Sequence, residues 1–121
     1  MATKCSVLTL KSKAKHDFGR IIRDVDGSIL KIVEHRDASP KEKIVDESNS
    51  GVYCFDKELF FKALSCLGDD NVQKEYYLTD TLEYAMKNGY PVASVQTEDT
   101  DEIFGINSPE DLKRAENLLE N

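Results

Sequence analysis

Strand-like and helix-like segments alternate along the second half of this chain. A β-prone run at residues 47–55 leads into an amphipathic run headed by Asp56, and a second amphipathic run after Thr79 leads into the β-prone residues 91–97. Such alternation places helices against a sheet, whereas the first half contains mainly short β-prone runs. We therefore predict an α/β fold, a mixed β-sheet with packed helices, in a single domain over residues 1–121.

The β-prone runs of the first half lie at residues 6–10, 18–23 and 28–33. Between the last two stands Asp26-Gly27, a dipeptide that favours a type I′ hairpin turn, in which both central residues have positive φ. Ser39-Pro40 predicts the start of a short helix, with serine as N-cap and proline in the first turn.

Three longer helices are expected in the second half, each with an apolar stripe facing the sheet. Asp56 caps the first, which Gly68 ends. Asp80 and Glu83 have capping-box spacing at the start of the second, which Gly89 ends. The third starts at Ser108-Pro109, and its stripe consists of Leu112, Ala115, Leu118 and Leu119.

Charge and cysteine content exclude several classes of function. The net charge of −7 argues against binding to nucleic acid or to an anionic membrane, because both require a basic surface. Cys5, Cys54 and Cys66 are odd in number and lack C-x-x-C spacing, so neither a disulfide framework nor a zinc site is indicated. No apolar run has membrane-spanning length and the first residues lack a signal peptide, so we expect the reducing cytoplasm.

The segment at residues 71–80 is rich in side chains that both stack and hydrogen-bond. These are Gln73, Glu75, Tyr76, Tyr77, Thr79 and Asp80. Sugars favour this combination, because their hydroxyls donate and accept while their C–H groups lie on aromatic surface. The alternative is a capping segment before a helix with two half-buried tyrosines. The residues of this segment alone leave both interpretations open.

Five motifs occur in order along the chain: Phe18-Gly19-Arg20, Glu34-His35-Arg36-Asp37-Ala38, Asn49-Ser50-Gly51, Glu75-Tyr76-Tyr77-Leu78-Thr79-Asp80 and Gly105-Ile106-Asn107. Together they closely resemble the later half of the N-acetylglucosamine-1-phosphate uridyltransferase domain of the bifunctional bacterial enzymes that also carry an acetyltransferase domain. The resemblance covers nearly the whole chain. It implies the C-terminal half of a Rossmann-like nucleotide-diphospho-sugar transferase domain.

The resemblance also implies a reaction and a set of binding residues. That family makes UDP-N-acetylglucosamine and pyrophosphate from UTP and N-acetylglucosamine 1-phosphate. The positions that match its sugar-binding residues are Gly19, Glu34, Asn49, Glu75, Tyr77, Thr79 and Asn107. Asn107 further resembles the asparagine that holds magnesium together with an aspartate of the earlier half. A carboxamide alone is a poor magnesium ligand, so magnesium is expected only together with that half.

The nucleotide-binding half, with its glycine-rich loop, and the acetyltransferase domain have no counterpart in these residues. We therefore expect the chain to be the sugar-binding half of the domain, inactive alone and dependent on a partner chain that supplies the nucleotide-binding half. The alternative is a non-catalytic module that binds a sugar nucleotide or another protein. An exposed sheet edge where the other half would pair favours a homodimer.

Overall fold

The computed structural model describes residues 3–13, 18–69 and 74–120. The strands are β1 (Cys5–Lys11), β2 (Arg20–Arg23), β3 (Ile29–Val33), β4 (Glu47–Phe55) and β5 (Val92–Thr97). The helices are α1 (Pro40–Lys43), α2 (Lys57–Leu64), α3 (Asp80–Lys87) and α4 (Pro109–Glu120), with short 3-10 turns η1 (His35–Asp37) and η2 (Thr100–Ile103). The predicted α/β class with a mixed sheet is confirmed.

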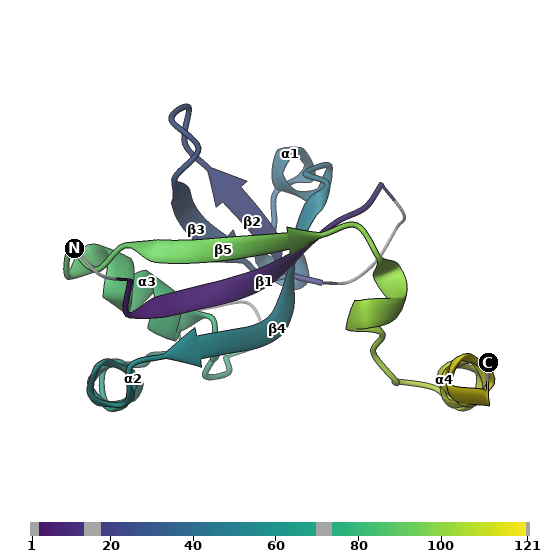
Figure 1. Ribbon diagram of the computed structural model, residues 1–121. Helices are drawn as coiled ribbons and strands as arrows, with labels where there is room; N and C mark the ends of the chain where they lie inside the picture. Colours follow the sequence, from purple (N-terminus) through teal and green to yellow (C-terminus); the bar gives the residue numbers. More distant parts are fainter. Residues whose placement is uncertain (1–2, 14–17, 70–73, 121) are drawn as a thin grey trace.

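The five strands form one sheet in the order β3-β2-β4-β1-β5 (Figure 1). β1 pairs antiparallel with β4, where Cys5 faces Phe55, and parallel with β5, where Cys5 faces Val92. β2 and β3 form a hairpin that joins the rest through the pair Arg20 and Ser48. The outer strands of this sheet are therefore β3 and β5.

Helices α2 and α3 cover one face of the sheet and enclose the core. This core consists of Cys5, Val7, Ile21, Ile29, Ile32, Leu59, Leu82 and Ala85. The spacing of Leu59 and Ala63 on α2, and of Leu82 and Ala85 on α3, turns one apolar side of each helix inward, as the sequence predicts. No helix among the described residues is both long and apolar enough to cross a membrane.

The hairpin between β2 and β3 is confirmed, but its predicted turn type is wrong. Gly27 has φ +89°, whereas Asp26 does not have positive φ, so the turn is not type I′. The Gly27 amide donates to the Asp24 carbonyl at 3.0 Å, and the pairing shifts register beside Arg23. The glycine thus closes a wider loop with a bulged strand, which needs only one left-handed residue.

Two helix boundaries differ from prediction. α2 ends at Leu64, because the Cys66 and Leu67 amides then donate to carbonyls three residues earlier and tighten the chain before Gly68. The predicted capping box of α3 is wrong. Asp80 is the first helical residue, while the Thr79 hydroxyl donates to Glu34 instead of accepting from the helix.

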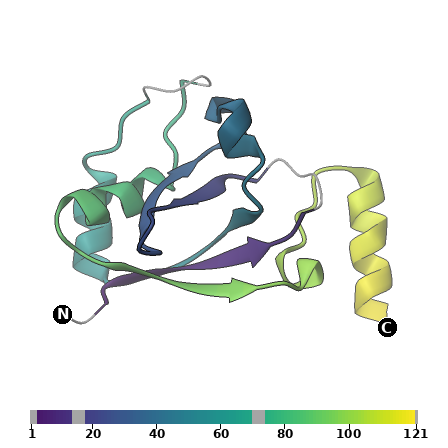
Figure 2. The same ribbon diagram turned by 90° about the horizontal axis from the view of Figure 1, so that it is seen from above.

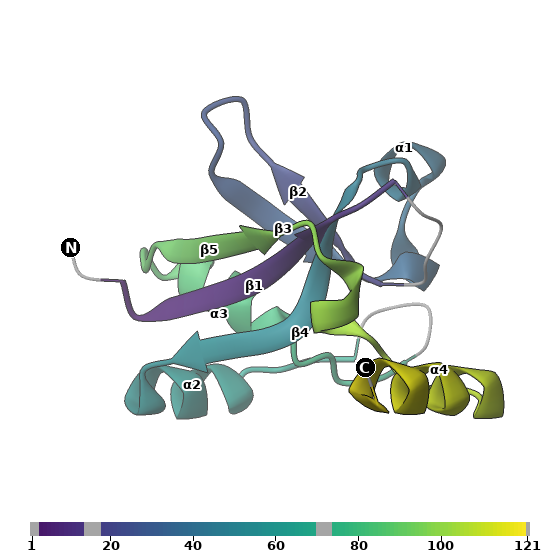
Figure 3. The ribbon, with the colours of Figure 1, turned by 45° about the vertical axis from the view of Figure 1, so that its right-hand side comes forward.

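Helix α4 begins where predicted, with the Ser108 hydroxyl accepting from the Asp111 amide, but its predicted burial is wrong. None of its residues is buried, and Leu119 is 88% exposed. Figures 2 and 3 show the reason, since α4 stands at the opposite end of the molecule from the layer formed by α2 and α3. Its apolar stripe has no described surface to cover.

Candidate functional site

Four of the predicted binding residues meet around the start of β2. They are Gly19, Glu34, Asn49 and Thr79, from the residues before β2, the end of β3, strand β4 and the start of α3. Hydrogen bonds and close contacts join all four, although 60 positions of sequence separate the first from the last. We call these four residues the Gly19 cluster.

Gly19 connects two sides of the cluster through its backbone. Its carbonyl accepts a hydrogen bond from the Asn49 amide at 2.8 Å, which continues the contact between β2 and β4. A Cβ atom at Gly19 would lie 3.3 Å from the Val33 carbonyl oxygen and 3.5 Å from the Glu34 Oε2. The absence of a side chain therefore lets the Glu34 carboxylate lie directly over this backbone.

Glu34 is held by the Thr79 hydroxyl, which donates to its Oε1 at 3.1 Å. Burial raises the pKa of Glu34, and the negative charges of Asp37 and Asp80 raise it further, whereas the Thr79 bond lowers it. The net effect is a raised pKa, because burial outweighs the hydrogen bond from Thr79. This carboxylate can accept hydrogen bonds from ligand hydroxyls.

The Asn49 side chain is held at both ends. Its Oδ1 accepts from the Gly51 amide at 3.0 Å, and its Nδ2 donates to the Tyr53 hydroxyl at 2.6 Å. Gly51 has φ +83°, and this left-handed conformation requires glycine. The sequence prediction missed Tyr53. Residues four apart in a regular strand are about 13 Å apart, but the register of β4 against β1 shifts between Asn49 and Tyr53, around the left-handed Gly51, and this irregularity brings the two side chains together.

Glu75 and Tyr77 lie in the extended segment that leads to Thr79. Glu75 is exposed and Tyr77 is partly buried, with the Tyr77 carbonyl accepting from the Asp80 amide at 3.1 Å. Along the chain, Glu75 and Tyr77 lie four and two residues before Thr79 of the cluster. Gln73, from the same predicted segment, lies outside the described residues.

Asn107 lies in the loop that follows Gly105. A Cβ atom at Gly105 would lie 4.0 Å from the Phe18 ring and 3.6 Å from the Asn107 Nδ2, so this loop lies beside the residue that precedes Gly19. The Asn107 amide donates to the Asp111 carboxylate at 3.0 Å, and its side chain is exposed.

The residues around Asn107 do not fit a magnesium ion by themselves. Magnesium prefers octahedral oxygen ligands that include carboxylates or phosphates, and Asn107 offers one carboxamide oxygen. The Asp111 carboxylate is already engaged by the Asn107 backbone. Among the described residues, no group of three or more histidine, cysteine or acidic side chains is arranged to hold a metal.

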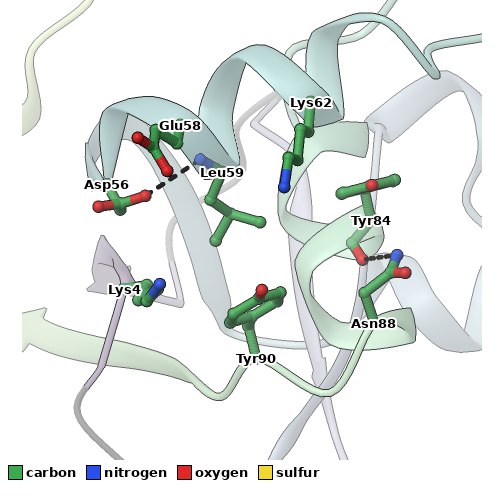
Figure 4. Close-up of a pocket in the computed structure, with 8 residues that line it drawn as sticks. All are labelled: Lys4, Asp56, Glu58, Leu59, Lys62, Tyr84, Asn88 and Tyr90. Carbon is green, nitrogen blue, oxygen red and sulfur yellow. Dashed lines mark hydrogen bonds between the residues drawn. The ribbon is translucent and has the colours of Figure 1, made fainter.

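A separate cavity of about 220 Å³ opens at the other end of α3 (Figure 4). It is lined by Lys4, Asp56, Glu58, Leu59, Lys62, Tyr84, Asn88 and Tyr90. Two lysines balance two carboxylates, and Asp56 already caps α2 through the Leu59 amide at 3.1 Å. This balance favours no particular ligand charge, so the Gly19 cluster is the stronger candidate site.

Comparison with solved structures agrees with the fold. The chain superposes with a TM-score of 0.68 on a nucleoside-diphosphate-sugar pyrophosphorylase from Vibrio cholerae, at 13% identity, covering 93% of this chain and 46% of that one. A candidate glucose-1-phosphate thymidylyltransferase from Bacillus anthracis gives a TM-score of 0.65 at 20% identity, covering 96% and 43%. At these identities the likeness concerns the fold alone.

Comparison with curated relatives concerns the sequence. The chain is 46% identical over 115 residues to the bifunctional protein GlmU of Lactobacillus gasseri and 43% identical over 116 residues to that of Bacillus cereus. These matches cover 95% and 96% of the chain but only 25% of each relative's length.

The resemblance placed this chain in the later half of the uridyltransferase domain, and that placement is corrected. The part of the bifunctional relatives that the chain matches is the amino-terminal one. Correspondence to one half of the uridyltransferase domain itself stays a prediction. The model of the nucleotidyl transferase family matches residues 2–113, which is nearly the whole chain. The chain therefore belongs to the nucleotidyl transferase family.

Proposed function

We propose that residues 1–121 are the sugar-binding half of a uridyltransferase domain that forms UDP-N-acetylglucosamine and pyrophosphate from UTP and N-acetylglucosamine 1-phosphate. The single observation that carries this proposal is the Gly19 cluster. Four positions that match the family's sugar-binding residues come from separate elements and contact one another. The similarity to bifunctional GlmU proteins supports the choice of sugar and nucleotide.

The free hydrogen-bonding capacity of the cluster suits a sugar. The Glu34 carboxylate offers only acceptors, so it pairs with ligand hydroxyls. Asn49 retains one N–H and one lone pair after its bonds to Tyr53 and Gly51. Gly19 presents backbone without a side chain, which lets a ligand approach closely. Glu75, Tyr77 and Asn107 are proposed to border the same ligand.

We also propose that these 121 residues need a partner with the nucleotide-binding half to carry out transfer. Phosphoryl transfer depends on cations that position and neutralise the phosphates. The arginine nearest Gly19 in sequence is not available for this role, since Arg20 is buried and donates to the backbone carbonyls of Phe18 and Lys43. The proposed partner would supply both the phosphate-binding cations and the aspartate that completes a magnesium site with Asn107.

The test of transfer is an assay of pyrophosphate release. The purified chain is incubated with UTP, magnesium and N-acetylglucosamine 1-phosphate, with and without the first half of the uridyltransferase domain of the Lactobacillus gasseri relative. We expect no release by the chain alone and release by the mixture. Release by the chain alone would contradict the requirement for a partner.

The test of binding is an NMR titration with UDP-N-acetylglucosamine. We expect amide shifts in the residues around Gly19 and Asn49, and loss of those shifts in Asn49→Ala. Asn88→Ala is the matched control, because the Asn88 side chain donates to the Tyr84 carbonyl of its own helix, at 2.8 Å, away from the Gly19 cluster. No shifts at millimolar ligand would contradict sugar binding and favour the alternative of a protein-interaction module.

A further inference from the structure

Tyr53 has a hydroxyl whose only hydrogen bond among the described residues comes from Asn49. The Asn49 Nδ2 donates to it at 2.6 Å, so the phenolic oxygen acts there as an acceptor. A tyrosine hydroxyl also carries one hydrogen that it can donate. The bond from Asn49 does not use that hydrogen.

We propose that Tyr53 is a positioning residue for Asn49 and that its hydroxyl donates to an acceptor oxygen of the bound sugar. The proposal rests on the proposed function, because it concerns the same site. The Gly51 amide holds one end of the Asn49 carboxamide at 3.0 Å, and Tyr53 holds the other. A flip of the carboxamide would break both bonds, so its remaining N–H and lone pair keep one orientation.

The tyrosine ring is itself held in place. It packs edge-on against Phe55, with ring centroids 6.3 Å apart and planes at 69°, and it contacts the hydrophobic core. An aromatic side chain fixed in this way gives its hydroxyl a defined position at low entropic cost. The packing does not involve the hydroxyl, so removal of the oxygen leaves the ring contacts intact.

The Tyr53 hydroxyl remains a donor over the whole range in which proteins work. Burial raises the pKa of Tyr53 to about 12, the Asn49 bond lowers it and the charge of Glu34 raises it. Gly19 and Asn49 link the two groups, because the Gly19 carbonyl accepts from the Asn49 amide at 2.8 Å and a Cβ atom at Gly19 would lie 3.5 Å from the Glu34 Oε2. A donor from Tyr53 beside an acceptor from Glu34 complements a sugar, which presents both kinds of group.

The experiment compares Tyr53→Phe with the matched control Tyr84→Phe, which removes the same atom from a tyrosine of α3 that lines the separate cavity. The first measurement needs no ligand. The side-chain NH₂ signals of Asn49 are identified by their absence in Asn49→Ala. We expect Tyr53→Phe to shift them toward the position of exposed amides and to speed their exchange with water, and Tyr84→Phe to leave them unchanged.

The second measurement is the Kd for UDP-N-acetylglucosamine. We expect Tyr53→Phe to raise it about tenfold, equivalent to about 1.4 kcal/mol, and Tyr84→Phe to leave it unchanged. Wild-type Asn49 signals in Tyr53→Phe would overturn the positioning role, and a wild-type Kd would overturn the donor role. If the wild-type chain does not bind, the proposed function and the donor role both fail, while the ligand-free spectra still decide the positioning role.

Discussion

The buried environment of Glu34 is expected to lower the stability of the folded protein at neutral pH. A carboxylate with a raised pKa binds protons more readily in the folded than in the unfolded state, so it lowers stability once pH exceeds the folded pKa. The penalty disappears as pH falls through that value. We therefore expect the desolvated Glu34 carboxylate to lower stability while it serves as a hydrogen-bond acceptor for the ligand.

Replacing Glu34 with glutamine removes this penalty. We expect Glu34→Gln to raise Tm by a few degrees at pH 7, with the gain vanishing as pH falls below the raised pKa, and to weaken sugar-nucleotide binding. Calorimetry over a pH series measures the first effect, and NMR titration the second.

Glu42→Gln is the control, and we expect it to lower stability at neutral pH instead of raising it. The Ser39 amide and the Lys31 ammonium, 2.9 Å from the carboxylate, lower the pKa of Glu42, so its charge favours folding at neutral pH. A gain in stability for Glu42→Gln, or a loss for Glu34→Gln, would refute this account.

Gly19 is expected to tolerate no side chain without a loss of binding. A Cβ there meets the Val33 carbonyl oxygen at 3.3 Å, which is tighter than an ordinary contact, and it covers backbone that a ligand would approach. We expect about tenfold weaker binding of UDP-N-acetylglucosamine in the NMR titration and a stability loss near 1 kcal/mol.

Gly68→Ala is the matched control for this substitution. Nothing lies within 4 Å of a Cβ at Gly68, and its φ is not positive. If both substitutions weaken binding equally, steric crowding at Gly19 is not the cause of the weaker binding.

At the level of elements, α3 and α4 have similar amphipathic sequences but opposite surroundings. Leu82 on α3 is 0% exposed, and Leu119 on α4 is 88% exposed. We expect Leu82→Ala to lower the free energy of unfolding by about 2–5 kcal/mol and Leu119→Ala by less than about 0.5 kcal/mol, as measured by urea denaturation. A loss above 1 kcal/mol for Leu119→Ala would mean that α4 packs against an apolar surface in solution.

A polar network on four strands fixes how the hairpin joins the sheet. Glu47 on β4 accepts from Arg23 on β2 at 2.6 and 2.8 Å, from Thr9 on β1 at 2.8 Å and from Gln96 on β5 at 3.2 Å. Burial alone would raise the pKa of Glu47, but the Arg23, Thr9 and Gln96 bonds together lower it. The carboxylate therefore stabilises the fold at neutral pH.

Glu47→Gln is expected to lower the free energy of unfolding by about 2 kcal/mol at pH 7, because it leaves the Arg23 guanidinium without its charged partner. The deficit should shrink as pH falls through the lowered pKa, where wild-type Glu47 is itself protonated. Urea denaturation at several pH values measures this. A deficit that does not change with pH would mean that the charge of Glu47 is not what stabilises the sheet.

At the level of the whole molecule, the outer strand β5 and helix α4 both carry exposed apolar side chains. Val95 on β5 is 64% exposed, and no helix crosses the near face of β1, β4 and β5 in Figure 1. An exposed outer strand of this kind favours pairing with another chain, and the homodimer expected from the sequence stays a prediction.

Light scattering after size exclusion tests that prediction. We expect the mass of the chain to rise with concentration and Val95→Lys to suppress the rise, because lysine on an outer strand opposes strand pairing. A monomer at every concentration would rule out association through this edge.

Local chemistry in the sequence determined most elements of this protein. β4, α1 and the starts of α2 and α4 lie where side-chain periodicity and capping residues predict them, because those signals act within a few residues. The resemblance to a family named Gly19, Glu34, Asn49 and Thr79, but not Tyr53.

Only the tertiary structure decided which surfaces meet. It engaged the Thr79 hydroxyl with Glu34 instead of with its helix, left the stripe of α4 exposed and joined Asn49 to Tyr53. Each of these outcomes depends on contacts between segments that are distant in sequence. A local sequence pattern indicates that a side chain will be buried or hydrogen-bonded, but it does not identify the partner. The physical reason is that burial and hydrogen bonding are satisfied by the whole fold, not by the neighbours in the chain.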